Sequence, residues 1–121
     1  MLDFKKSKSP RGKLIKKLDV LFSKLIRERD KVCQYCKKSS VIYCHHIFSR
    51  RHLGTRFDES NAISLCVYCH RLIAHGDPEK FRDFIIQRKG QEAFDLLKFK
   101  AFSAAKYSQT DLEWLLKDIK K

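Results

Sequence analysis

The chain has 121 residues, which fits one globular domain and is too short for two full hydrophobic cores. It carries 27 Lys and Arg against 14 Asp and Glu, and the net charge of +13 favours a polyanionic partner. A hydrophobic fraction of 43% argues against global disorder, and no apolar run approaches the roughly 18 residues of a membrane span. The Lys-rich N-terminus lacks the apolar stretch of a secretory signal, so we expect a soluble protein of the reducing cytoplasm.

The N-terminal third holds much of the charge surplus. Residues 1–9 are expected to form a basic flexible arm. Residues 10–31 predict an amphipathic basic helix, because apolar side chains recur there every three or four positions. The polar face of this helix includes Lys13, Lys16 and Lys17, which either contact nucleic-acid phosphates or form an ordinary solvated face.

The helical period disappears in residues 32–76. Two short β-rich pieces, residues 41–43 and 62–65, flank a polar stretch and predict a two-stranded hairpin. A short helix is expected over residues 67–74, with Gly76 just past its end. This part of the chain therefore predicts the order strand, loop, strand and short helix.

Residues 77–121 are expected to form helical packing elements that complete a single domain. The dipeptide Asp77-Pro78 predicts the capped start of one helix, and a second helix follows it. A final helix is expected from Thr110, where Thr110 and Glu113 form a capping box.

Four of the five cysteines form two C-x-x-C units, Cys33 with Cys36 and Cys66 with Cys69. Two residues between thiolates let a tight turn present both sulfurs to one ion, and four such ligands close a structural zinc site. The alternatives are disulfides, which a reducing compartment disfavours, and a thioredoxin-like redox motif, which would use one pair. We therefore predict structural Zn²⁺, with Cys44 as a small buried residue.

The histidines of the same segment need a different role, because four thiolates already saturate a zinc ion. His45 and His46 are adjacent on the first predicted strand, so their side chains point to opposite faces. Phosphodiester hydrolysis suits such a division: one imidazole holds a metal ion, and a second takes a proton from water. The alternative is that these histidines belong to a zinc knuckle or to a hydrogen-bonded core.

The order His45-His46, Asn61 and His70, set between and beside the two Cys pairs, resembles the HNH endonucleases of the zinc-ribboned subtype. The likeness covers about residues 33–75 and implies a small α+β fold with a ββα-metal core. Residues 56–61 and 90–95 further resemble the phage recombination endonucleases of the NinG (Rap) kind. That second likeness implies a phage-encoded or bacterial protein.

Roles for four residues follow from the resemblance. It makes His46 the general base that activates water, and Asn61 the residue that pins the loop between the strands and orients the His46 ring. It makes His45 and His70 ligands of the catalytic metal. Imidazole ligands suit Mn²⁺ better than Mg²⁺, which prefers oxygen, so we expect Mn²⁺ to support activity better.

His75 departs from the family pattern. The third histidine ligand of related nucleases lies four residues after His70, where this sequence has Ala74. On an ideal α-helix, five residues at about 100° each put His75 roughly 140° from His70. His75 is therefore a ligand only if the helix unwinds, and phosphate contact or an ordinary helix-end histidine are the other interpretations.

Four arginines near the predicted strands are candidate phosphate contacts, with surface charge as the alternative for each: Arg50, Arg51, Arg56 and Arg71. The favoured function is a metal-dependent DNA endonuclease that nicks one strand or acts on branched DNA, as a monomer or homodimer. A non-catalytic zinc-ribbon module that binds nucleic acid is the main rival, and an RNA-directed nuclease is a third possibility.

Overall fold

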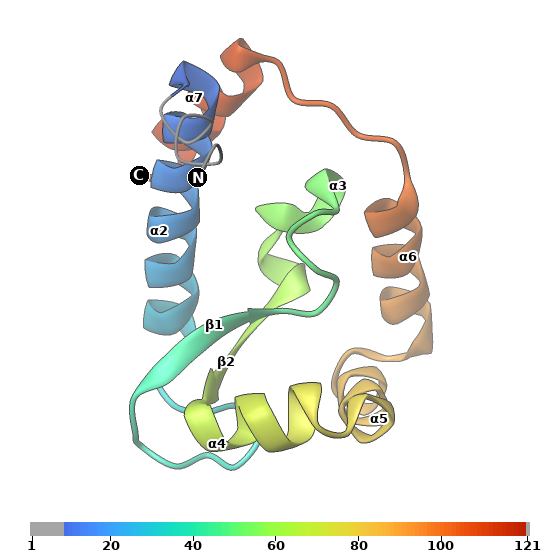
Figure 1. Cartoon of the computed structure of the whole chain (residues 1–121). Coiled ribbons are helices and arrows are strands. Elements are labelled where there is room, and N and C mark those ends of the chain that lie inside the picture. Colours follow the sequence, from blue (N-terminus) through green and yellow to red (C-terminus); the bar gives the residue numbers. More distant parts are fainter. Residues whose placement is uncertain (1–8, 121) are drawn as a thin grey trace, which may run out of the picture.

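The computed structural model describes residues 9–120, so the arm expected for residues 1–9 lies outside the described residues apart from Ser9. The fold is small and α+β, with one two-stranded sheet surrounded by helices (Figure 1). The elements in chain order are α2 (Pro10–Asp30), β1 (Ile42–His46), α3 (Leu53–Arg56), η1 (Glu59–Asn61), β2 (Ala62–Cys66), α4 (Val67–Cys69), η2 (His70–His75), α5 (Pro78–Lys89), α6 (Gln91–Phe102) and α7 (Gln109–Ile119). None of these helices has the length and apolarity needed to cross a lipid bilayer.

Helix α2 packs along one side of the sheet, and local signals set its start. The Ser9 hydroxyl oxygen accepts a hydrogen bond from the backbone N–H of Gly12 at 2.9 Å, and a proline occupies the first turn. The buried face is made by three side chains spaced four residues apart, Leu18, Phe22 and Ile26. Helix α7 packs against α2, so the two ends of the described chain lie together (Figure 1).

The two strands pair antiparallel, and their register fixes where the histidines point. His45 lies opposite Ile63 and His46 opposite Ala62. Because side chains alternate along a strand, the His45 ring faces α5, 5.1 Å from the Phe81 ring, while the His46 ring faces α2, 5.5 Å from the Phe22 ring. The adjacent imidazoles therefore lie on opposite faces of the sheet.

The hydrophobic core has one cluster on each face of the sheet. The larger one joins β2 to α5 and α6, and its buried members include Ile63, Leu65, Phe81, Ile85 and Phe94. The smaller one joins α2 to the start of β2 through Phe22, Ile26 and Ala62. Every side chain of β2 is buried, so this strand is the centre of the fold.

The polar stretch between the strands contains two short helices, α3 and η1, that the sequence pattern does not predict. Helix α3 packs closely on α6 at Gly54, where an added Cβ would lie 2.6 Å from the carbonyl oxygen of Lys100. An ion pair of 2.5 Å between Lys100 and Asp58 holds the same two regions together. The segment is therefore a packed part of the fold.

The prediction of a capping box at Thr110 and Glu113 is wrong, because helix α7 begins one residue before Thr110. Ser108 is the N-cap: its hydroxyl accepts the N–H of Asp111 at 3.1 Å, and the Asp111 carboxylate accepts the N–H of Ser108 at 2.9 Å. Helix α7 thus starts at Gln109, and Thr110 already lies in its first turn. Both Ser-x-x-Asp and Thr-x-x-Glu fit the sequence rule, and the chain uses the first.

Candidate functional site

The four paired cysteines converge on one point: the sulfur atoms of Cys33, Cys36, Cys66 and Cys69 all lie within 4.8 Å of one another. In each C-x-x-C unit the second cysteine donates its backbone N–H to the first sulfur, at 3.5 Å for Cys36 and 3.4 Å for Cys69. Four thiol groups in one compact cluster match the tetrahedral sulfur coordination of a structural zinc ion. All five cysteines in residues 9–120 are free, and none forms a disulfide there.

The thiolate is the form of cysteine that binds metal, and the surroundings of the cluster act differently on two of its members. Burial and then the neighbouring thiols raise the pKa of Cys69, whereas the pKa of Cys33 is lowered. Burial opposes ionisation of Cys33, but backbone N–H groups, those of Cys36 and Cys66 foremost, outweigh it and lower the pKa of this thiol to about 6. The first turn is also fixed to the sheet, because the N–H of Gln34 donates to the carbonyl oxygen of Ser64 at 3.0 Å. The cluster therefore joins the chain before β1 to the end of β2.

Three histidines form a second cluster. His45 comes from β1, and His70 and His75 come from η2; one ring nitrogen of each lies within 4.8 Å of the others. The Nε2 atoms of His70 and His75 are 3.2 Å apart. Three imidazoles are a donor set that suits Mn²⁺, Co²⁺, Ni²⁺ or Zn²⁺, and they leave further coordination positions for water and substrate oxygens.

The helix geometry explains how His75 joins this cluster despite its spacing. Residues His70–His75 form a π-helix, in which backbone hydrogen bonds run from residue i to i+5 instead of i+4. This wider turn brings His75 back over His70, which an α-helix would not do. The sequence predicts that His75 joins the cluster only if the helix unwinds, and the π-helix is a locally underwound turn that places His75 there.

The two half-buried imidazoles of this cluster, His45 and His70, have lowered pKa values, which favours the neutral form that binds a metal ion. Burial, and then the nearby His70 and His75 rings, lower the pKa of His45 to about 3. Burial and then the neighbouring His75 ring also lower the pKa of His70. His75 is the exposed member, so the cluster opens to solvent on that side.

His46 lies on the other face of β1 and is held by one hydrogen bond. Its Nε2 atom is 2.9 Å from the carbonyl oxygen of Arg56. A carbonyl only accepts, so Nε2 carries the proton and Nδ1 is the nitrogen able to accept one. Burial lowers the pKa of His46, and the hydrogen bond to Arg56 partly offsets this. The imidazole is thus neutral and fixed in one tautomer near pH 7.

One cavity connects His46 with the histidine cluster. It has a volume of about 390 Å³, and its lining includes all three clustered histidines, His46, Asp19 and Arg50. A water molecule or a phosphate oxygen in this cavity has access to both kinds of imidazole. Although adjacent strand residues face opposite ways, His46 and the three clustered imidazoles therefore border one space at the end of β1.

Asn61 is fully buried and holds the loop that follows β1. Its side-chain oxygen accepts the N–H of Phe48 at 2.8 Å, and its amide nitrogen donates to the carbonyl oxygens of Phe48 and Thr55 at 2.9 and 3.0 Å. Among the described residues, these bonds all go to the backbone of residues 48–55, and none goes to His46. Any influence of Asn61 on the His46 ring therefore passes through the loop.

Arg56 has an internal partner, although the sequence suggests a phosphate contact. Its guanidinium forms two hydrogen bonds to the Asp19 carboxylate, at 3.0 and 2.6 Å, and a third to the carbonyl oxygen of Arg50. Because the carbonyl of Arg56 also holds His46, this pair fixes the His46 loop to α2. The sequence pattern does not single out Asp19 as part of the site. The one signal for it is that Asp19 is the only acidic residue between Pro10 and Arg27.

The other predicted cationic contacts remain at the surface. Arg50 is 58% exposed at its side chain and lies 3.5 Å from Asp19 at the edge of the cavity. Five further cations on α2, on the loop after β1 and on η2 are exposed: Lys13, Lys16, Lys17, Arg51 and Arg71. These side chains are available to a polyanion, whereas the Arg56 guanidinium is bound to Asp19.

Comparison with protein families gives one match. Residues 33–75 match the family model described as HNH endonuclease. The matched segment contains both cysteine pairs, the three clustered histidines, His46 and Asn61. No curated protein and no solved structure matches the chain. The segment that holds both clusters is therefore similar to an HNH endonuclease domain, and the match ends before α5.

Proposed function

We propose that this protein is a metal-dependent DNA endonuclease that hydrolyses phosphodiester bonds and nicks one strand. The observation that supports this best is the shared cavity. A neutral imidazole with a defined proton-accepting nitrogen, His46 Nδ1, and a cluster of three imidazoles open into the same space. A protein that only binds nucleic acid has no need of this arrangement.

Different residues of the chain have different roles in the proposed reaction. His45, His70 and His75 hold a divalent ion, Mn²⁺ in preference to Mg²⁺. When bound, that ion supplies positive charge for the pentacoordinate phosphorane and the departing 3′ oxygen. His46 accepts a proton from the attacking water at Nδ1, and the carbonyl of Arg56 stabilises the resulting imidazolium through Nε2–H.

The remaining residues position the substrate and the site. Arg50, at the rim of the cavity, is placed to contact the phosphate of the strand being cut. The exposed lysines of α2 supply affinity that does not depend on sequence and weakens with salt. Structural Zn²⁺ in the four-cysteine cluster fixes the hairpin that carries the histidines.

A plasmid assay tests the proposal. Supercoiled plasmid is incubated with the protein and Mn²⁺, and open-circle product is measured for wild type, His46→Ala and His52→Ala. We expect nicking by wild type, a loss of about 10²- to 10⁴-fold for His46→Ala, the usual size of a general-base contribution, and no change for His52→Ala. His52 is the matched control because its ring packs on Phe102, outside the shared cavity.

The same assay separates the rival functions. DNA retardation in gels without open-circle product would identify a zinc-ribbon binding module and overturn the proposal. A four-way junction and an RNA duplex, compared with linear DNA duplex, test the branched-DNA preference implied by the NinG-like segments and the choice of sugar. A monomer with one such site nicks, so double-strand cleavage that rises steeply with protein concentration would indicate a homodimer.

A further inference from the structure

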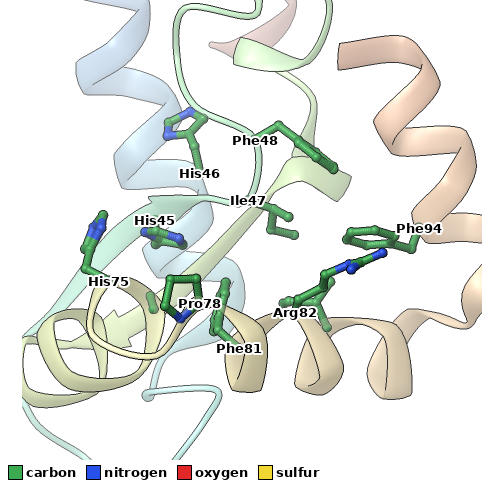
Figure 2. A pocket seen from close by; sticks show the side chains of 11 residues that line it. His45, His46, Ile47, Phe48, His75, Pro78, Phe81, Arg82 and Phe94 are labelled. Atoms are coloured by element: carbon green, nitrogen blue, oxygen red, sulfur yellow. The ribbon is translucent and has the colours of Figure 1, made fainter. Parts of the chain in front are cut away.

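A second cavity, of about 380 Å³, lies beside the histidine cluster on the side of α5 and α6 (Figure 2). His45 and His75 lie on one side of it, and Phe48, Arg82 and Phe94 lie on the other (Figure 2). The volume is at the lower end of the range for small-ligand pockets, about 300–1,000 Å³. His45, His46 and His75 form part of its lining, and the rest of this space has no role in the proposed cleavage chemistry.

The lining of this second cavity is unsuited to a phosphate and suited to a flat aromatic ring. Its walls are mostly apolar, and among the described residues that line it Arg82 is the one Lys or Arg. The Phe48 and Phe94 rings have centroids 5.5 Å apart, and the Arg82 guanidinium carbon lies 5.6 Å from the Phe94 centroid. Aromatic rings and an arginine plane are the side chains on which proteins stack unpaired nucleobases.

The position of the second cavity links such a base to the reaction. His45, His46 and His75 line both this cavity and the shared cavity. A nucleotide with its base in the second cavity therefore has its own phosphate beside the histidine cluster. A base stacked within a duplex cannot enter, because it must first leave the helix.

We propose that the second cavity receives one unpaired nucleobase of the strand that is cut, next to the scissile phosphate. This inference rests on the proposed function and gives it a substrate class: DNA with an extrahelical or unpaired nucleotide at the cleavage point. Five lining residues lie outside the matched segment 33–75: Pro78, Phe81, Arg82, Ile85 and Phe94. Part of the pocket is thus built by α5 and α6, which lie beyond the matched segment.

Binding by a cleavage-deficient protein tests the pocket without using activity. His46→Ala is titrated, with Mn²⁺ present, into three labelled duplexes: fully paired, with a single bulged nucleotide, and with the same bulge lacking its base. We expect the bulged duplex to bind roughly tenfold more tightly than the base-less bulge, the size of one base-stacking contact. Fluorescence anisotropy gives the three dissociation constants.

Two α5 variants provide the matched comparison. His46→Ala/Arg82→Ala removes the cation beside Phe94 and should lose most of the preference for the bulged base. His46→Ala/Lys80→Ala removes one exposed cation of the same helix, one that does not line the cavity, and should keep the preference. Phe48→Leu in the same background keeps an apolar side chain but removes the ring, and should reduce the preference as Arg82→Ala does.

The outcomes separate the pocket from the endonuclease. Equal affinity for the bulge with and without its base would overturn the proposal that the pocket binds a base. This holds even if both bulged duplexes bind better than the paired duplex, because that result would show only a preference for flexible DNA. An undiminished preference in both the Arg82→Ala and Phe48→Leu proteins would also overturn it. Failure of wild type to nick any plasmid would overturn the endonuclease, while the binding series would still decide whether the cavity holds a base.

Discussion

The two clusters of metal-binding side chains differ most in what surrounds them. In both, the potential ligand atoms lie within 4.8 Å of one another. The cysteine cluster is mostly buried, and its backbone N–H groups point at its own sulfurs. The histidine cluster has one exposed member, and its half-buried members line an open cavity.

Under the proposed function, this difference lets one short segment hold two metal ions with different roles. A closed set of four thiolates has no position left for substrate, so an ion held there would contribute to folding. A set of three imidazoles at a cavity leaves coordination positions open, so an ion held there would contribute to chemistry. Changes to the first cluster should therefore alter stability, and changes to the second should alter rate.

The largest expected effect is on folding, from Cys66→Ser. This change removes one of four ligands from a site of a kind that contributes on the order of 10 kcal/mol to apparent folding free energy. We expect the variant to be unfolded or to melt far below wild type, as measured by circular dichroism against temperature. A strong chelator should have the same effect on wild type.

Cys44→Ser is the control for this experiment. Cys44 is half-buried on the same hairpin but is not part of the four-cysteine cluster. Its melting temperature should stay within a few degrees of wild type. If Cys66→Ser and Cys44→Ser melt together, the cysteine cluster does not stabilise the fold in the way its geometry indicates.

The second effect is on rate, from His70→Ala. Losing one imidazole weakens the hold on a catalytic ion whose charge is worth several kcal/mol in the transition state, so we expect at least roughly a hundredfold slower nicking. The melting temperature should change little, because His70 is half-buried at the cavity edge. Raising Mn²⁺ should restore part of the rate of His70→Ala and none of that of His46→Ala. A large loss of stability in His70→Ala would remove the distinction between the clusters.

The cysteine cluster and the hairpin were predictable because their signals are local. The C-x-x-C spacing, the β-rich pieces and the alternation that separates His45 from His46 all lie within a few residues of sequence. Strand β1 begins at Ile42 and β2 at Ala62, within one residue of expectation. The four-cysteine cluster and the α+β fold are confirmed in the structure.

The contacts and the helix geometry that position the histidines could not be predicted from local sequence patterns. The segment His70–His75 is a π-helix in contact with α5, and no residue type specifies that geometry. The contact between Asp19 and Arg56 joins positions 37 residues apart. Arg56 therefore looked like a phosphate contact, because sequence shows a cation's charge but not its partner.

The third effect concerns Asp30, at the end of α2 near the cysteine cluster. Its carboxylate accepts the N–H of Ser64 on β2 at 2.8 Å and pairs with Arg29. We expect Asp30→Asn to lower the free energy of unfolding by about 1–3 kcal/mol, as for hydrogen bonds to charged groups, with little effect on nicking per folded molecule. Denaturant unfolding measures the first quantity and the plasmid assay the second.

The loss in Asp30→Asn should depend on pH. Burial opposes ionisation, but the hydrogen bonds from Arg29 and Ser64 outweigh it and lower the pKa of Asp30. A carboxylate with a lowered pKa stabilises the fold above its unfolded pKa, and this contribution is lost as pH falls through the folded pKa. Wild type and Asp30→Asn should therefore converge in stability in acid. A gap that is constant between pH 3 and 7, roughly the range around an unperturbed Asp, would contradict the assignment.

The smallest expected effect comes from Asp19→Asn, on the same helix but beside the histidine cavity. Asp19 does not touch the His46 ring; it holds the Arg56 guanidinium, and the Arg56 carbonyl holds His46. As a positioning residue it should cost about tenfold in rate, the size of one lost charge-assisted hydrogen bond, and the rate should recover in part in Asp19→Glu. A purely structural role would instead lower the melting temperature and leave the rate of the folded fraction unchanged. Asp19→Asn and Asp30→Asn thus form a matched pair on one helix. The first should change the nicking rate, and the second should change the free energy of unfolding. The opposite result would show that Asp19 does not support the histidine cluster and Asp30 does not support the fold near the cysteine cluster.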